Sequence, residues 1–136
     1  MKLLFSILVL TLALGGFALA ANAQDNENQE IKVRVGKQKK ASCSKLNVKF
    51  VSVIEDSRCA EGTTCVWAGN AKIKITIQEG ESPAETFEIN TETGARGATY
   101  GRFAIYLTEL TPTPKANRRI NRNAYTATFS IKRLSR

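Results

Sequence analysis

The sequence predicts an all-β protein: an antiparallel β-sandwich, or a small barrel, of about six or seven strands with one local disulfide. Three observations lead to this expectation. Apolar and polar residues alternate with a period of two along most of the chain, and glycine and proline recur between the alternating stretches. No stretch beyond residue 23 keeps a helical period over several turns, so crossover helices are not expected.

Residues 1–23 have the pattern of a secretory signal peptide. Lys2 precedes an almost wholly apolar stretch, which ends in the small-x-small cleavage site Ala21-Asn22-Ala23. An uncleaved membrane anchor is the alternative, because the apolar run approaches a spanning length. We expect cleavage near Ala23, which would leave no transmembrane span and a secreted or periplasmic protein in an oxidising compartment. Residues 24–30 are polar and are expected to form a flexible tail before a single β domain over residues 31–136.

Six segments alternate regularly enough to predict strands. In each, every second residue is apolar, and the segments cover residues 31–35, 45–53, 71–78, 86–90, 103–108 and 125–132. The alternation changes parity between Phe50 and Val51, which indicates a β-bulge or a strand buried on both faces. A short seventh strand is expected around Val66 and Trp67.

The three cysteines carry the sharpest local signal. Cys59 and Cys65 flank five residues that include a glycine, and in a secreted chain this spacing predicts a disulfide closing a small loop. Such a ring stabilises the fold by roughly 2 kcal/mol, and Trp67 beside it is expected to be a core residue. Cys43 is a buried free thiol, an intermolecular link or the true partner of one of the other two, because three cysteines allow three single bridges.

The stretch DSRCAEGTTCVWAG, residues 56–69, resembles the D-S-R-C-P-x-x-x-x-C-x-W-A-G signature of a largely uncharacterised family of small exported bacterial proteins and lipoproteins. Ala60 stands where that signature has proline. The resemblance implies a secreted bacterial β domain with a Cys59–Cys65 bridge, and it implies no activity. The residues that match the signature are Asp56, Ser57, Arg58, Cys59, Cys65, Trp67, Ala68 and Gly69.

The other residues of this motif loop have structural explanations. Asp56 and Arg58 are two apart, so in an extended segment they share a face and are expected to pair. Asp56 is equally suited to accept hydrogen bonds from loop amides. The alternative to a structural role for Asp56, Ser57, Arg58, Trp67 and Gly69 is a recognition loop presented by the bridge.

Residue chemistry argues against an enzyme. The chain has no histidine, so it has no histidine base, no Ser-His-Asp triad and no histidine metal ligand. Two thiolates are too few for a zinc site, and no phosphate-binding glycine motif or nucleophile elbow is present. We therefore expect no catalytic residue, no metal and no cofactor. An atypical small hydrolase and a structural envelope protein remain as third alternatives.

Charge is the remaining functional signal, with 20 Lys and Arg against 12 Asp and Glu and a formal net charge of +8. Arginine forks suit phosphate, sulfate and carboxylate groups, whereas the alternative is a merely solvated basic surface. The sequence thus favours a non-catalytic binding module for anionic polysaccharide, lipid headgroups or an acidic protein, and export disfavours cytosolic nucleic acid. The runner-up is an inhibitor-like module presenting the disulfide loop to a partner enzyme. The candidate anion-binding residues are Lys115, Arg118, Arg119 and Arg122, all before the last predicted strand.

Overall fold

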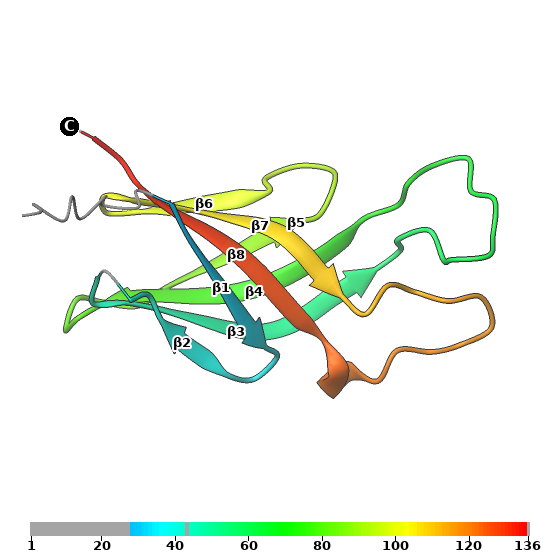
Figure 1. Ribbon diagram of the computed structural model, residues 1–136, viewed down its shortest axis with the longest axis horizontal. Helices are drawn as coiled ribbons and strands as arrows, with labels where there is room; N and C mark the ends of the chain where they lie inside the picture. Colours follow the sequence, from blue (N-terminus) through cyan, green and yellow to red (C-terminus); the bar gives the residue numbers. More distant parts are fainter. Residues whose placement is uncertain (1–27, 43, 136) are drawn as a thin grey trace, which may run out of the picture.

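The computed structural model describes residues 28–42 and 44–135, and it is an all-β antiparallel sandwich (Figure 1). One sheet has the strand order β1-β8-β7-β6, and the other has the order β2-β3-β4-β5. The predicted sandwich is therefore confirmed over the barrel. The signal peptide and Cys43 lie outside the described residues. The strands are β1 (Asn28–Arg34), β2 (Gln38–Lys40), β3 (Leu46–Asp56), β4 (Ala71–Glu79), β5 (Glu85–Asn90), β6 (Gly97–Tyr100), β7 (Phe103–Thr111) and β8 (Thr126–Arg133), with a 3-10 helix η1 (Arg122–Ala124) before β8.

The core lies between the two sheets and is built from the alternating residues that the sequence pattern marked. Ile73, Ile75 and Ile77 of β4 are fully buried, and they pack in one apolar cluster with Phe50 of β3 and Phe129 of β8. Lys and Thr residues between the isoleucines lie on the outer face of the sheet. This one-sided burial is the reason why period-two alternation located the strands correctly.

The bulge predicted in β3 is present. The register of β3 against β4 shifts between Phe50 and Ser52, and it shifts again between Val53 and Glu55. Beyond these irregularities Asp56 pairs with Ala71, so β3 ends where β4 begins. Between those two residues the chain forms a loop outside the sandwich, and this loop contains Cys59 and Cys65.

Three details differ from the sequence-based expectations. β1 begins at Asn28, because Asn28, Gln29 and Glu30 pair with β8; the expected flexible tail is wrong for these three residues. No strand forms at Val66 and Trp67. The short strands β2 and β6 were not predicted, since three and four residues leave no room for an alternating pattern.

Two long connections project from the same end of the sandwich. Residues 57–70 join β3 to β4, and residues 112–125 join β7 to β8, whereas β8 ends at the opposite end (Figure 1). We call the first connection the disulfide loop and the second the basic loop. No helix among the described residues is long and apolar enough to cross a membrane.

Candidate functional site

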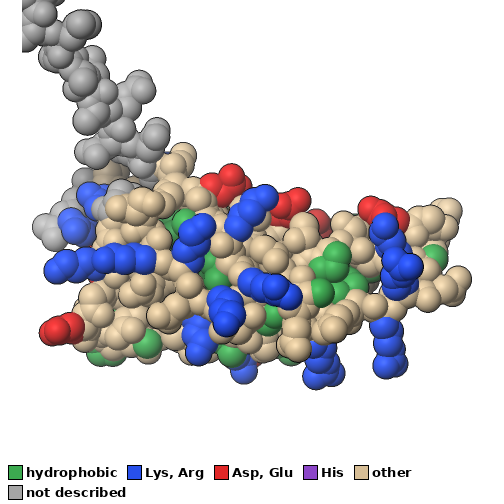
Figure 2. Space-filling model, turned by 60° about the horizontal axis from the view of Figure 1, so that its bottom comes forward, with side chains coloured by type: hydrophobic (Ala, Val, Ile, Leu, Met, Phe, Trp, Pro, Cys, Tyr) green, Lys and Arg blue, Asp and Glu red, His purple; other side chains and the backbone are tan. Residues whose placement is uncertain are grey.

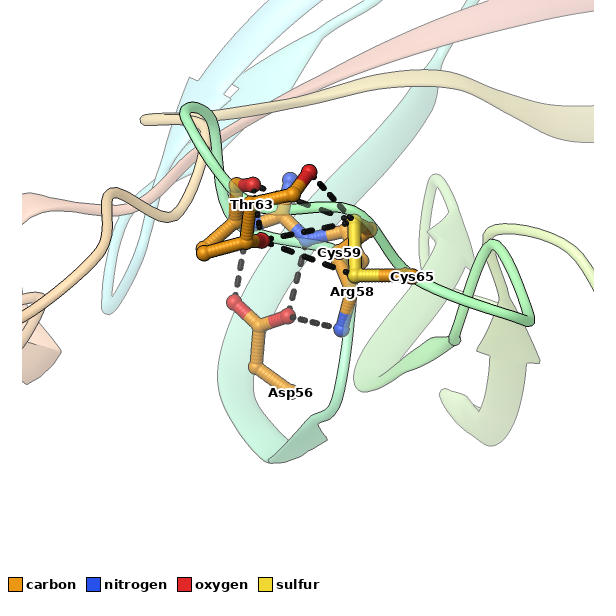
Figure 3. Close-up of a disulfide and its surroundings, with 6 residues drawn as sticks. Asp56, Arg58, Cys59, Thr63 and Cys65 are labelled. Atoms are coloured by element: carbon orange, nitrogen blue, oxygen red, sulfur yellow. Dashed lines mark hydrogen bonds and ion pairs between the residues drawn. A yellow bond between two sulfur atoms is a disulfide. The ribbon is translucent and has the colours of Figure 1, made fainter.

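The disulfide loop contains the predicted Cys59–Cys65 bridge, which is confirmed with an S–S distance of 2.06 Å (Figure 3). Thr63 turns the chain inside the ring, because its hydroxyl donates a 2.6 Å hydrogen bond to the carbonyl of Ala60. The same hydroxyl oxygen lies 3.7 Å from Sγ of Cys59 and 3.6 Å from Sγ of Cys65. The ring is thus a compact turn with its own internal contacts.

Below the ring the two arms of the loop run side by side, and we call residues 57–59 and 68–70 the neck. The amide of Ser57 donates to the carbonyl of Asn70 at 2.7 Å, and the amide of Cys59 donates to the carbonyl of Ala68 at 2.9 Å. Gly69 has a φ of +73°, and a Cβ there would lie 1.9 Å from the carbonyl oxygen of Ser57. Only glycine fits this approach, which explains its place in the motif.

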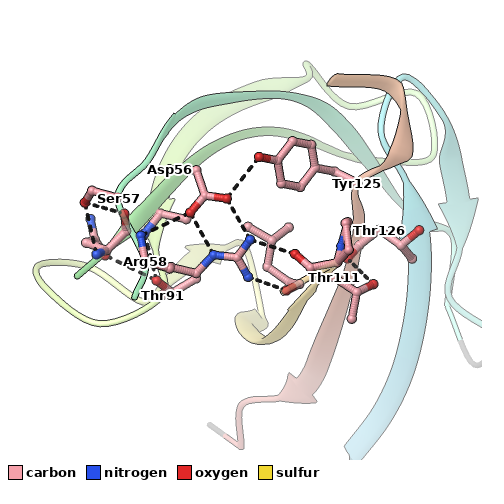
Figure 4. A network of polar contacts seen from close by, with 11 residues as sticks. Asp56, Ser57, Arg58, Thr91, Thr111, Tyr125 and Thr126 are labelled. Carbon is pink, nitrogen blue, oxygen red and sulfur yellow. Dashed lines mark hydrogen bonds and ion pairs between the residues drawn. The ribbon is translucent and has the colours of Figure 1, made fainter. Parts of the chain in front are cut away.

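Asp56 and Arg58 pair as predicted, and their contacts extend well beyond the loop (Figure 4). The guanidinium donates two hydrogen bonds of 2.8 and 2.7 Å to the carboxylate. It also donates to the carbonyl of Leu110 in β7 and to that of Pro112 at the start of the basic loop. The amide of Arg58 also donates to Asp56, at 3.2 Å, which confirms the second expected role of this carboxylate. Because four guanidinium donors are already engaged, Arg58 fastens the loop to the other sheet and is not free for a ligand.

The hydroxyl of Tyr125 completes this network by donating a 2.9 Å hydrogen bond to Asp56. Burial alone would raise the pKa of Asp56, but hydrogen bonds from Arg58 and Tyr125 and the charge of Arg58 hold it below its usual value. Burial, together with the neighbouring carboxylate, raises the pKa of Tyr125 to about 12. At neutral pH the network therefore consists of a carboxylate, a guanidinium and a neutral phenol.

Asn70 anchors the base of the disulfide loop and was not singled out by the sequence. Its Oδ1 accepts hydrogen bonds from the amides of Glu92 and Thr93, at 3.1 and 3.3 Å. Its Nδ2 donates to Oδ1 of Asn90 at 2.8 Å. An asparagine after a glycine indicates only a turn. The sequence therefore could not predict that the Asn70 side chain binds the segment after β5.

The basic loop lies directly against the disulfide loop. The amide of Glu61 donates to the carbonyl of Pro114 at 2.8 Å, the amide of Ala116 donates back to Glu61 at 3.3 Å, and the Lys115 ammonium lies 4.0 Å from the Glu61 carboxylate. Two features predicted independently thus form one surface, which we call the loop end (residues 57–70 and 112–125). All four residues that were predicted to bind an anion are exposed there: Lys115, Arg118, Arg119 and Arg122.

Trp67 also belongs to the loop end, and the expectation that it is a core residue is wrong. Its side chain is 81% exposed, and that of the adjacent Val66 is 90% exposed. Both lie above the neck, where the loop has left the sandwich and neither sheet covers it. Among the described residues the indole N–H of Trp67 has no hydrogen-bond partner.

Positive charge continues from the loop end along one edge of the sandwich. Nε of Arg34, at the end of β1, donates to the carbonyl of Asn123 at 3.2 Å, so this strand end lies beside η1. Exposed lysines follow in the next turn and in β2, at positions 37, 39 and 40. On the face shown in Figure 2, Lys and Arg side chains are spread along the length of the molecule.

A pocket of about 170 Å³ lies beside Arg58, but its lining carries both charges, from Glu92, Glu109 and Arg96. No group of three acidic, cysteine or histidine residues within residues 28–42 and 44–135 is placed to hold a metal ion. Comparisons with protein-family models, with curated proteins and with solved structures found no match. The resemblance to the exported family therefore stays a prediction.

Proposed function

We propose that this protein is an exported, non-catalytic binding module that recognises an anionic partner through its loop end. The observation that carries the proposal is the pairing of the two loops at Glu61 and Lys115, which places the basic side chains beside a bridged loop. The Cys59–Cys65 bridge supports an oxidising compartment, where such bonds persist.

The arginines of the basic loop support anion recognition because their guanidinium groups are not engaged elsewhere. In the part of the chain that the structure describes, the side chains of Arg118, Arg119 and Arg122 make no hydrogen bond or ion pair. Arg58 at the base of the disulfide loop is the opposite case, since its guanidinium donors are bonded to Asp56, Leu110 and Pro112. Free planar forks are suited to bidentate contacts with phosphate, sulfate or carboxylate.

The chemistry of Asp56 supports a binding role over a catalytic one. This carboxylate is almost buried, and Arg58 and Tyr125 hold it in its ionised form. A carboxylate with a lowered pKa is a weak base at neutral pH, so the most perturbed acid of the motif is suited to fastening the loop.

The test is binding to a soluble polyanion, dextran sulfate, measured by titration calorimetry at low and high salt. We expect the triple variant Arg118→Ala/Arg119→Ala/Arg122→Ala to bind about tenfold more weakly, and the wild-type affinity to fall with added salt. The matched control, Lys45→Ala/Arg102→Ala/Lys132→Ala, removes the same charge from exposed positions outside the loop end. If both triple variants lost the same affinity for dextran sulfate, net charge alone would explain the binding, and the proposal would be contradicted.

A second candidate function is inhibition of a partner enzyme by the disulfide loop. The observation in its favour is the bridged, internally bonded turn that carries exposed Val66 and Trp67. A loop ordered before binding loses little conformational entropy in a cleft. Inhibition of this kind would survive high salt and would disappear when the Cys59–Cys65 bridge is reduced, which separates it from anion binding.

A further inference from the structure

Trp67 differs from the other residues of the motif loop because its side chain makes no contact within the described residues that would explain its presence there. Asp56, Arg58 and Ser57 are bonded within the loop or to β7, and Gly69 is required by the close approach at the neck. Trp67 and its neighbour Val66 instead project into solvent, at 81% and 90% exposure. The other large apolar side chains exposed in the described residues reach only 40–50%, and these are Ile54, Tyr106 and Leu134.

The apolar tip is held in place before any partner arrives. The ring is closed by the Cys59–Cys65 bridge (Figure 3). The neck is hydrogen-bonded, and Arg58 fastens the base of the loop to the carbonyls of Leu110 and Pro112. Exposing an indole costs free energy, and fixing it at the tip of a rigid loop reduces the entropy lost on binding. This arrangement is typical of an anchor side chain.

The shape and charge of the tip favour one kind of occupant. A stable protein partner needs a broad, complementary area with a packed centre, whereas here the apolar surface consists of two adjacent exposed side chains, Val66 and Trp67. The surroundings are basic: Lys115, Arg118 and Arg119 lie on the loop paired with it. Tryptophan with adjacent cations is the combination that suits the headgroup region of an anionic bilayer, which yields around a protruding tip without a preformed pocket.

We propose that the loop end docks on an anionic phospholipid bilayer, with Trp67 and Val66 inserted at the boundary between headgroups and acyl chains. Lys115, Arg118 and Arg119 then contact lipid phosphates beside the inserted tip. This inference rests on the proposed anion-binding function and names its partner. It also explains why the one large aromatic side chain of the motif lies outside the core.

Trp67 is the only tryptophan in the chain, so intrinsic fluorescence reports on the proposed anchor alone. The full mature protein is mixed with vesicles of phosphatidylcholine, with or without phosphatidylglycerol. With phosphatidylglycerol present we expect a blue shift of the emission and quenching by lipids brominated on their acyl chains. With phosphatidylcholine alone we expect neither, because the cations find no anionic partner.

Variants separate the tip from the charge in a vesicle co-sedimentation assay. We expect Trp67→Ala to bind anionic vesicles about tenfold more weakly and to keep its affinity for soluble dextran sulfate. The triple arginine variant is expected to bind both the vesicles and dextran sulfate about tenfold more weakly. Leu134→Ala, which removes an exposed apolar side chain near the opposite end, serves as the control and is expected to change neither.

Each other outcome contradicts the bilayer proposal in a distinct way. Vesicle binding without a change in Trp67 emission would leave anion binding but overturn insertion. Dextran sulfate binding without vesicle binding would do the same, and if an acidic protein then bound in a Trp67-dependent manner, the tip would be a protein-docking site. A blue shift that appears without vesicles as the protein concentration rises would assign Trp67 to a contact between copies of the chain. Failure to bind either anionic probe would overturn both the bilayer proposal and the proposed function.

Discussion

Tyr125 donates a 2.9 Å hydrogen bond to Oδ2 of Asp56, and this contact links the two sheets at the base of the loop end (Figure 4). Asp56 is the last residue of β3, and Tyr125 immediately precedes β8 in the other sheet. The carboxylate also holds Arg58, whose guanidinium reaches the carbonyls of Leu110 and Pro112. One largely buried carboxylate therefore organises both projecting loops at their base.

Removing this carboxylate is expected to destabilise the protein strongly. We expect Asp56→Ala to lower the free energy of unfolding by about 3 kcal/mol, because it leaves a largely buried guanidinium without its counter-ion. Urea denaturation measures the loss. The neighbouring Glu55→Ala is the control, since Glu55 is exposed, and a change within about 0.5 kcal/mol is expected there. Equal stability of the two variants would show that the network is not a stabilising element.

Acid is expected to weaken the same network. The pKa of Asp56 is lower in the folded protein than its ordinary value of 3.8, so its contribution to stability is complete above that value. The contribution is lost as the pH falls through the lower folded-state pKa. The difference in unfolding free energy between wild type and Asp56→Asn should therefore shrink below pH 3.8. A difference that stays constant into strong acid would contradict this assignment.

The alkaline side has the opposite sign and depends on Tyr125. Its pKa is raised from 10.0 to about 12, so its stabilising contribution is present below pH 10.0 and is lost as the pH rises toward 12. Ultraviolet titration of the folded protein should show one phenol that ionises near pH 12 and is absent from Tyr125→Phe. If the variant keeps that late component, another tyrosine is responsible.

The disulfide loop provides a matched pair of glycine substitutions, one in the ring and one in the neck. Gly62 and Gly69 both have positive φ, but a Cβ at Gly62 meets nothing within 4 Å, whereas one at Gly69 would collide with Ser57. We expect Gly62→Ala to cost about 1 kcal/mol through backbone strain alone. Gly69→Ala should cost about 3 kcal/mol or more, because the neck must open. Urea denaturation and limited proteolysis of the disulfide loop measure both effects, and similar results for the two variants would refute the steric argument.

The fold was largely predictable because a strand that is buried on one face has apolar residues at every second position of its sequence. Ile73, Ile75 and Ile77 alternate with lysine and threonine, so β4 and its neighbours were recognised. Short strands carry no such record: β2 is Gln-Lys-Lys, wholly exposed, and is held by its pairing with β3. The polar start of β1 is likewise strand through its pairing with β8, not through its own composition.

The candidate site was predictable only where its contacts are local. The Asp56–Arg58 pair follows from a spacing of two residues, and the Cys59–Cys65 ring follows from its short separation. The bonds from Arg58 to Leu110 and from Tyr125 to Asp56 span dozens of residues and leave no pattern. The prediction that Trp67 is buried was wrong because apolar side chains are usually buried, whereas this indole lies on a loop outside the sandwich.

Removal of the disulfide should loosen the ring and leave the sandwich intact. The double variant Cys59→Ser/Cys65→Ser is expected to lose roughly 2 kcal/mol of stability, the loop-closure contribution of a small ring. The sheets should persist, because the neck hydrogen bonds and the Arg58 contacts lie outside the ring. Amide hydrogen exchange should therefore speed up at residues 60–64 and stay slow in β3 and β4. Faster exchange throughout both strands would contradict this prediction, because it would mean that the bridge supports the whole sheet. The variant's affinity for anions would then decrease as well, since the basic loop is held in place by the disulfide loop.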